Sequence, residues 1–306
     1  MNMKISSRWG CVILALIALA SCAWLYRQIF PDCHAPLDNP NLEVIISACR
    51  NPHLHSTSPD GTYMVYGTEE RDGGLWLRSL TTGEEQRLSA YSDYWISSEL
   101  LLQETKYEGV REFQIYDVQT KSQTPLQSVL AISGATSRLD DGTLVFSPEV
   151  LTWFQQADKV YYAPDSLSIA IALASDFKSH PQANYVFATS GNSPRDSEAI
   201  ARFLMENNIT YVEIHRGFDF EHPLPSHDGR FVAVGSRITT PGGEILVQTT
   251  KYIDPITGWA SDDSGVYFQS SGVQDPPILF PLFSLGIRQP ILKLNLPPEY
   301  LTPAAR

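Results

Sequence analysis

The sequence has few basic residues and no long glycine- or proline-rich stretch, and each shortage excludes a class of protein. Lysine and arginine number 22 against 34 acidic residues, which gives a net charge of −12. A chain this acidic repels the phosphate backbone, so no nucleic-acid partner is predicted. Glycine and proline together number 40 of 306 residues, which is close to average use and excludes collagen-like and low-complexity chains. The 43% of hydrophobic residues excludes a wholly disordered chain.

The sequence also lacks the short motifs of common enzymes. It contains no G-x-S-x-G pentapeptide, no H-E-x-x-H motif, no C-x-x-C pair and no EF-hand loop. Two weaker patterns remain, His53-Leu54-His55 and the alternating Asp219, Glu221 and His222. Packed or solvated side chains explain both patterns more simply than metal binding or acid–base chemistry. We therefore predict no catalytic residue, no metal and no cofactor.

The longest apolar run lies at the N-terminus, where Trp9 to Tyr26 form eighteen residues without a charge. As a helix at about 1.5 Å per residue, this run reaches about 27 Å and just crosses the hydrocarbon core of a bilayer. Lys4 and Arg8 precede the run, so the positive-inside rule keeps the N-terminus in the cytoplasm. The sequence therefore predicts a single-pass membrane protein whose C-terminal domain is extracytoplasmic.

A cleaved lipoprotein signal is the alternative to a retained anchor. Leu19-Ala20-Ser21-Cys22 resembles a bacterial lipobox, in which Cys22 would carry the lipid and become the new N-terminus. The apolar run continues through Ala23-Trp24-Leu25-Tyr26, whereas mature lipoproteins usually begin with polar residues. This continuation favours the anchor, and both alternatives predict an exported and tethered protein.

Cys33 and Cys49 are the two cysteines beyond the apolar run. In an oxidising compartment, two such cysteines indicate one disulfide bond, which the loop-entropy model values at about 3 kcal/mol. A metal site made with nearby histidines is the alternative, but the spacing matches no standard zinc pattern.

A turn motif that returns along the chain is the main signal for the fold. Ser58-Pro59-Asp60-Gly61 supplies a proline that presets φ, an aspartate that bonds the backbone ahead and a glycine that accepts positive φ. Strand-like runs follow it, and similar turns precede strand-like runs near residues 98, 141, 165, 228 and 263. The intervals between these turns average about 41 residues, the length of one four-stranded propeller blade.

The longest interval, between the turns at 165 and 228, contains a predicted helix that starts at Ser193-Pro194 and continues to Met205. We predict that this helix is an insertion at 190–208 that joins the second strand of a blade to the third. It would then emerge on the face opposite the Asp-Gly turns. The alternative is that residues 184–214 form a β-α-β unit of a doubly wound α/β fold.

The Ser-Pro-Asp-Gly turn, followed by a hydrophobic strand and by Leu75-Trp76-Leu77, resembles the TolB-like β-propeller family, which is related in architecture to WD-repeat propellers. The resemblance and the six turns imply an all-β fold, a six-bladed β-propeller with one helical insertion, preceded by an N-terminal transmembrane or signal helix. The expected parts are an anchor over residues 1–30, a stalk and lead-in strand over 31–52, the propeller over 53–296 and a C-terminal tail over 297–306.

Two groups of residues are candidates for binding. Aromatic residues on the predicted innermost strands would either line a ligand site in the channel or wedge adjacent blades together: Trp95, Tyr162 and Trp259. Asn192, Ser193 and Arg195 offer polar groups to a partner at the N-terminus of the predicted helix. The simpler alternative is a helix that only packs down through Ile200, Phe203 and Leu204.

Propellers of this kind host peptidase gates, binding modules and some enzymes, so the fold alone does not decide the function. We expect a membrane-tethered extracytoplasmic propeller that acts as a non-catalytic binding module for a protein, peptide or glycan partner. The chain ends soon after the last predicted blade, which weighs against an appended peptidase domain. The alternatives are a hydrolase or lyase with its site in the propeller channel, and a structural component of an envelope complex.

Overall fold

Strands dominate the computed structural model of the chain. The structure describes Ser21 and residues 39–47, 50, 52–68, 74–90, 92–107, 110–128, 136–138, 144–164, 169–180, 183–188, 194–214, 223–249, 253–270 and 290–301. Apart from Ser21, the predicted anchor lies outside the described residues, as do the possible lipidation site Cys22, the predicted Cys33–Cys49 disulfide, Asn192 and Ser193. In the part of the chain that is described, no helix is long and apolar enough to cross a membrane.

Blades 1 and 2 are two consecutive antiparallel meanders of four strands each. Blade 1 consists of β2 (Pro52–Thr57), β3 (Tyr63–Thr68), β4 (Leu75–Ser79) and β5 (Glu85–Leu88). Blade 2 consists of β6 (Ser92–Trp95), β7 (Leu100–Tyr107), β8 (Val110–Asp117) and β9 (Ser122–Ser128). In β3, Val65 packs toward blade 2, whereas Met64 and Tyr66 pack on the other side. The strand is apolar on both faces because both faces are covered.

Blades 3 and 4 contain the predicted turns near residues 228 and 263, each between the first and second strands of its blade. Blade 3 consists of β16 (Leu224–Pro225), β17 (Val232–Val234), β18 (Arg237–Thr239) and β19 (Ile245–Gln248). Blade 4 consists of β20 (Ile253–Trp259), β21 (Gly265–Ser270), β22 (Ile291–Asn295) and, as its fourth strand, β1 (Leu42–Ile46). The first described strand of the chain thus completes the last blade, and the short helix α4 (Pro298–Leu301) follows β22.

A mixed unit of strands and helices lies between blades 2 and 3 in the sequence. It contains β10 (Thr136–Arg138), β11 (Leu144–Phe146), α2 (Pro148–Gln156), β12 (Lys159–Ala163), β13 (Ile169–Leu173), β14 (Tyr185–Ala188), α3 (Pro194–Glu206) and β15 (Val212–Glu213). Its main sheet has the order β15-β12-β13-β14, and β14 also pairs with β9 of blade 2. The hairpin of β10 and β11 forms a separate two-stranded sheet.

The predicted six blades are not confirmed, because two of the six turns do not begin four-stranded blades. The turns near 141 and 165 lie outside the described residues, but the strands on either side of them are described: β10 and β11 pair only with each other, and β12 and β13 pair within the mixed sheet. Helices α2 and α3 cover one face of this sheet, where Val150, Ile200 and Leu204 are buried against its strands. Helices here bury the apolar face that a further blade would otherwise cover.

The predicted connection of the helix was wrong. Helix α3 follows β14, the third strand of the mixed sheet, and leads to β15, which pairs in parallel with β12. Because β12 and β14 are both antiparallel to β13, they end at the same end of the sheet. The β-α-β alternative describes this local connection correctly, but the antiparallel pairs of β13 do not make a doubly wound fold.

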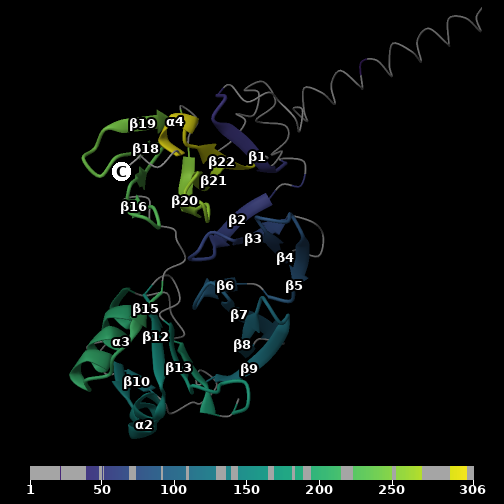
Figure 1. Cartoon of the computed structure of the whole chain (residues 1–306). Helices are drawn as coiled ribbons and strands as arrows, with labels where there is room; N and C mark the ends of the chain where they lie inside the picture. Colours follow the sequence, from purple (N-terminus) through teal and green to yellow (C-terminus); the bar gives the residue numbers. More distant parts are fainter. Residues whose placement is uncertain are drawn as a thin grey trace, which may run out of the picture.

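Shared apolar cores join the sheets in the order blade 3, blade 4, blade 1, blade 2 and mixed unit. Figure 1 shows that these sheets follow one another along an arc. One core holds Phe231 of blade 3 with Trp259 of blade 4, and another holds Leu77 of blade 1 with Leu101 of blade 2. Among the described residues, no core cluster joins the mixed unit to blade 3.

Candidate functional site

One face of the arc carries the Asp-Gly turns, and we call it the turn face. Within blades 1, 2, 3 and 4 the strands alternate in direction, so the turns after the first strand all reach the same face. The turns after the third strands of blades 1 to 3 reach this face too. The turn face therefore presents residues 58–62, 80–84, 96–99, 118–121, 226–231, 240–244 and 260–264.

The side chains of the repeated turn motif bond to their own turn. Ser58 Oγ accepts hydrogen bonds from the backbone N–H groups of Thr62 and Tyr63 at 3.1 and 2.9 Å, and donates to Asp60 Oδ1 at 2.7 Å. In blade 3, Ser226 and Asp228 repeat the arrangement, with Ser226 Oγ 2.9 Å from Asp228 Oδ1. These serines and aspartates shape the turn, which leaves them little capacity for a ligand.

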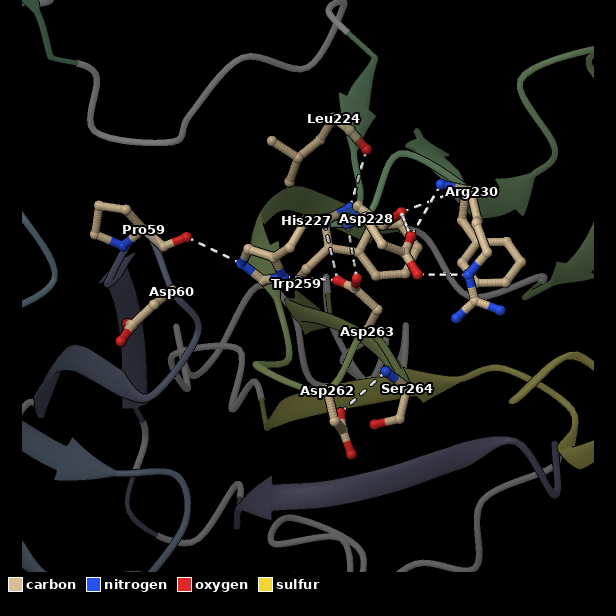
Figure 2. Close-up of polar contacts among 12 residues, drawn as sticks. Pro59, Asp60, Leu224, His227, Asp228, Arg230, Trp259, Asp262, Asp263 and Ser264 are labelled. Atoms are coloured by element: carbon tan, nitrogen blue, oxygen red, sulfur yellow. Dashed lines mark hydrogen bonds and ion pairs between the residues drawn. The ribbon is translucent and has the colours of Figure 1, made fainter. Parts of the chain in front are cut away.

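Asp263 of blade 4 holds the turn of blade 3 (Figure 2). Its carboxylate accepts hydrogen bonds from the backbone N–H groups of His227 and Asp228 at 3.0 and 3.1 Å, and lies 2.6 Å from the ring Nδ1 of His227. The other ring nitrogen of His227 lies 3.0 Å from the carbonyl oxygen of Pro59 in blade 1. One imidazole thus connects the turns of three blades.

Both ring nitrogens of His227 face partners on other blades. One partner is the carboxylate of Asp263 and the other is the backbone carbonyl of Pro59, and both partners are hydrogen-bond acceptors. Because both nitrogens are engaged, His227 serves contact between blades rather than acid–base chemistry.

Replacing Asp263 with alanine is expected to cost about 2–4 kcal/mol of the free energy of unfolding. The change removes three hydrogen bonds and leaves two backbone N–H groups without their acceptor. It also puts alanine at a φ of +54°, which asparagine tolerates better. Asp263→Asn is therefore the matched control and should cost less than half as much in urea unfolding. A loss of less than about 1 kcal/mol for Asp263→Ala would show that the carboxylate contacts carry little stability.

A second polar cluster lies where the first strands of blades 1 and 2 meet. Asp93, whose side chain is 1% exposed, lies 3.2 Å from the ring Nδ1 of His55 and accepts a hydrogen bond from Ser56 Oγ. Trp95 Nε1 donates to Ser56 Oγ at 3.1 Å. In a serine-hydrolase triad the histidine lies between the serine and the aspartate. Here the aspartate lies between the other two, so His55 is not placed as a base for Ser56.

A concave site on the turn face lies between blades 1 and 2. It has a volume of about 180 Å³ and is lined by Tyr63, Leu77, Ser79, Thr81, Thr82, Glu84, Glu85, Gln86, Val118 and Lys121. The apolar lining comes from Tyr63, Leu77 and Val118, while hydroxyl, amide and charged groups line the rest. It lies where the 80–84 turn of blade 1 meets the 118–121 turn of blade 2, and we call it the turn-face cavity.

The charged groups around the turn-face cavity are already paired. Lys121 Nζ lies 3.0 Å from Glu84 Oε1, and this ion pair connects blade 2 to blade 1. Glu85 pairs with Arg50 and Arg78, each at 2.7 Å. Burial acts to raise the pKa of Glu85, but hydrogen bonds from these two guanidinium groups outweigh burial and hold the pKa below its ordinary value. The Glu85 carboxylate is therefore ionised at neutral pH, and the guanidinium groups of Arg50 and Arg78 balance its charge.

The three aromatic residues proposed as ligand-lining groups are all buried at packing contacts. Trp95 is 4% exposed and stacks on Tyr63 between blades 1 and 2. Trp259 is 3% exposed, stacks on Phe231 of blade 3 and donates its indole N–H to the carbonyl oxygen of Leu224. Tyr162 is 4% exposed and packs in the core beneath α2 and α3. None of the three lines the turn-face cavity.

The polar candidates at the helix lie partly outside the described residues. Asn192 and Ser193 are not described, and of Arg195 the structure describes the backbone in α3 but not the side chain. The packing residues of the same helix are clear, since Ile200 and Leu204 are 1% and 0% exposed and Phe203 stacks on Phe146 with a 4.3 Å centroid separation. Packing of α3 onto the sheet is therefore confirmed, and partner binding at its N-terminus stays a prediction.

Sequence reasoning missed the turn-face cavity. Its polar residues are ordinary turn and edge-strand residues, such as Thr82 and Gln86, and no motif marks them. The available signal was the turn motif that returns after the first strand of each blade. Because strands alternate in direction, the turns after the third strands, at 80–84 and 118–121, lie on the same face as the motif. That signal does not say which turns of adjacent blades leave a space between them.

Comparisons with known proteins give only distant structural likenesses. No protein-family model and no curated protein sequence matches the chain. Solved structures that resemble it include TolB from Acinetobacter baumannii, with 14% identity, a TM-score of 0.24 and 81% of this chain covered. A TolB structure from Agrobacterium tumefaciens shows 14% identity and a TM-score of 0.26 over 76% of this chain and 74% of that chain. Tricorn protease shows 10% identity and a TM-score of 0.26 over 77% of this chain and 20% of that protein.

The chain spans 55% of the length of the Acinetobacter protein. All three TM-scores lie far below 0.5, and no function is transferred from likenesses of that strength. The assignment of blades therefore rests on the sheet order, on the shared apolar cores and on the closure of blade 4 by β1. The structure itself shows three antiparallel four-stranded sheets and one eight-stranded sheet packed one after another.

Proposed function

We propose that the protein is a membrane-tethered, extracytoplasmic binding module that engages a protein, peptide or glycan partner through its turn face and catalyses no reaction. The turn-face cavity is the observation that carries this proposal, because it is a concave site of mixed polarity on packed sheets. Rigid scaffolds that present loops and small pockets on one face are commonly used for binding. The tether rests on the apolar run from Trp9 to Tyr26 and its basic flank.

The arrangement of the histidines favours binding over catalysis. His227 has both ring nitrogens engaged between blades, and both His55 Nδ1 and the Ser56 hydroxyl have the buried Asp93 carboxylate as their partner. The carboxylates of Asp60 and Asp228 are likewise bonded to the backbone of their own turns. The polar groups that remain near the turn-face cavity, among them Thr81 and Thr82, are donors and acceptors suited to recognition.

The proposal is tested by site-specific photocrosslinking in intact cells. A photoreactive residue at the exposed position Thr82, on the turn face, is expected to crosslink a partner. The matched control is the exposed position Ser89, because it lies just beyond the other end of β5, on the opposite face. Crosslinks formed only from Ser89, or from neither position, would contradict a turn-face partner.

The extracytoplasmic location is tested separately with a reporter that is active only in the cytoplasm. Fused after Arg306, this reporter should remain silent; an active reporter would overturn the extracytoplasmic location.

A further inference from the structure

The geometry points to the turn-face cavity as a subsite for one neutral sugar ring of a glycan. This inference rests on the proposed binding function and specifies the chemistry of its ligand. It is carried by the charge balance, the composition and the size of the cavity.

The charge balance disfavours an ionic ligand. Glu84 is paired with Lys121, and Glu85 with two arginines, so each ionised group that lines the cavity has a partner of opposite sign. A cationic side chain or an anionic group would have to displace one of these partners to gain a strong contact. A neutral ligand accepts hydrogen bonds from Lys121 and donates them to Glu84 without separating the pair.

The lining matches the two kinds of surface on a sugar ring. The Tyr63 ring, Leu77 and Val118 offer apolar contacts for the C–H face of a pyranose. Hydroxyl groups of Ser79, Thr81 and Thr82, with the amide of Gln86, offer donors and acceptors to its hydroxyl groups.

The size selects one ring rather than an extended ligand. The cavity volume of about 180 Å³ is smaller than the roughly 300–1,000 Å³ of pockets that enclose drug-sized molecules. Its rim is formed by Thr81, Thr82 and Glu84, which are exposed. One ring of a longer glycan therefore enters, and its neighbours remain outside.

The site is held in place before any ligand arrives. Tyr63 stacks on Trp95 with a centroid separation of 6.4 Å and an interplanar angle of 26°, and the Trp95 indole is bonded to Ser56. Ser79 Oγ lies 3.1 Å from Thr81 Oγ1 and accepts the backbone N–H of Thr82 at 3.2 Å. Groups fixed by their neighbours lose little conformational freedom on binding.

The test is saturation-transfer NMR on the purified full chain in a zwitterionic detergent, because maltoside detergents would themselves present sugar rings. The probes are the methyl glycosides of glucose, galactose, mannose and N-acetylglucosamine. At least one is expected to bind saturably in the millimolar range. Tyr63→Leu should weaken this binding about tenfold and Thr82→Val about fivefold, whereas the opposite-face control Ser89→Ala should leave it unchanged.

Thr82→Val changes an exposed turn residue and keeps the variant folded even if Tyr63→Leu loosens the contact between blades. The inference is overturned if no glycoside binds, or if binding survives both variants. Salt-sensitive binding of a tri-lysine peptide that competes with the glycoside would also overturn it, because such a ligand is cationic. If crosslinking from Thr82 persists while no glycoside binds, the sugar subsite fails and the proposed function stands; if both are absent, both fail.

Discussion

Replacing Gly61 with alanine is expected to lower the free energy of unfolding by more than about 3 kcal/mol. Gly61 has a φ of +67°, and an added Cβ would lie 2.1 Å from the carbonyl oxygen of Trp259 and 2.8 Å from the backbone nitrogen of Ser261. Both neighbours are backbone atoms of blade 4, so they relax only if the contact between blades 4 and 1 opens. Urea unfolding followed by tryptophan fluorescence measures the loss, because the side chains of Trp95 and Trp259 are buried in the folded protein.

Gly229 provides the matched control for Gly61. It occupies the same position of the same turn motif in blade 3 and has a φ of +72°, but an added Cβ there meets nothing within 4 Å. Alanine at Gly229 therefore carries only the conformational cost of a left-handed residue, about 1–2 kcal/mol. Equal losses at the two glycines would show that backbone conformation, and not the close approach of the blades, requires glycine at this position.

Replacing Leu42 and Ile46 together with alanine is expected to cost about 4 kcal/mol or more and to open blade 4. Both side chains are buried, at 7% and 3% exposure, and both belong to strand β1. Leu42 pairs with Leu294 and Ile46 with Ile291 on β22, so β1 supplies the last strand of the blade. The first sign of opening should be faster hydrogen exchange at the amides of β22.

Val44 is the control on the same strand, because its side chain is 41% exposed. Val44→Ala should change stability by less than about 0.5 kcal/mol and leave hydrogen exchange in β22 unaltered. If Val44→Ala and the double variant have the same small effect, β1 does not close the blade energetically. A large effect of the double variant alone would show that burial of β1, rather than strand pairing by itself, completes blade 4.

The local turn chemistry and the strands beside it could be predicted from the sequence. Ser58, Asp60 and Gly61 form the expected turn because each acts on its own backbone within five residues. The same reasoning located the blade 3 turn at 226–229, and the strands predicted around both turns are present. Such interactions are short-range, so a single sequence contains all the information needed to infer them.

The mixed unit shows where the spacing argument fails. A mean interval of about 41 residues predicted a blade for every turn, yet β10 and β11 form only a hairpin and α3 connects two parallel strands. The helix itself was predicted from its own first residues. Its partner strand was not, because β15 pairs with β12 some fifty residues earlier in the chain. Long-range pairing of this kind leaves no local signal.

By itself, the sequence determined the acidic character, the dominance of strands, the repeated turns and the helix at α3. Only the tertiary structure decided that β1 completes blade 4, that His227 bonds two other blades, and that blades 1 and 2 leave the turn-face cavity between them. The physical reason is the range of the interactions. Turn and strand preferences act between neighbouring residues, whereas closure, contacts between blades and cavities depend on how surfaces far apart in the chain come to pack.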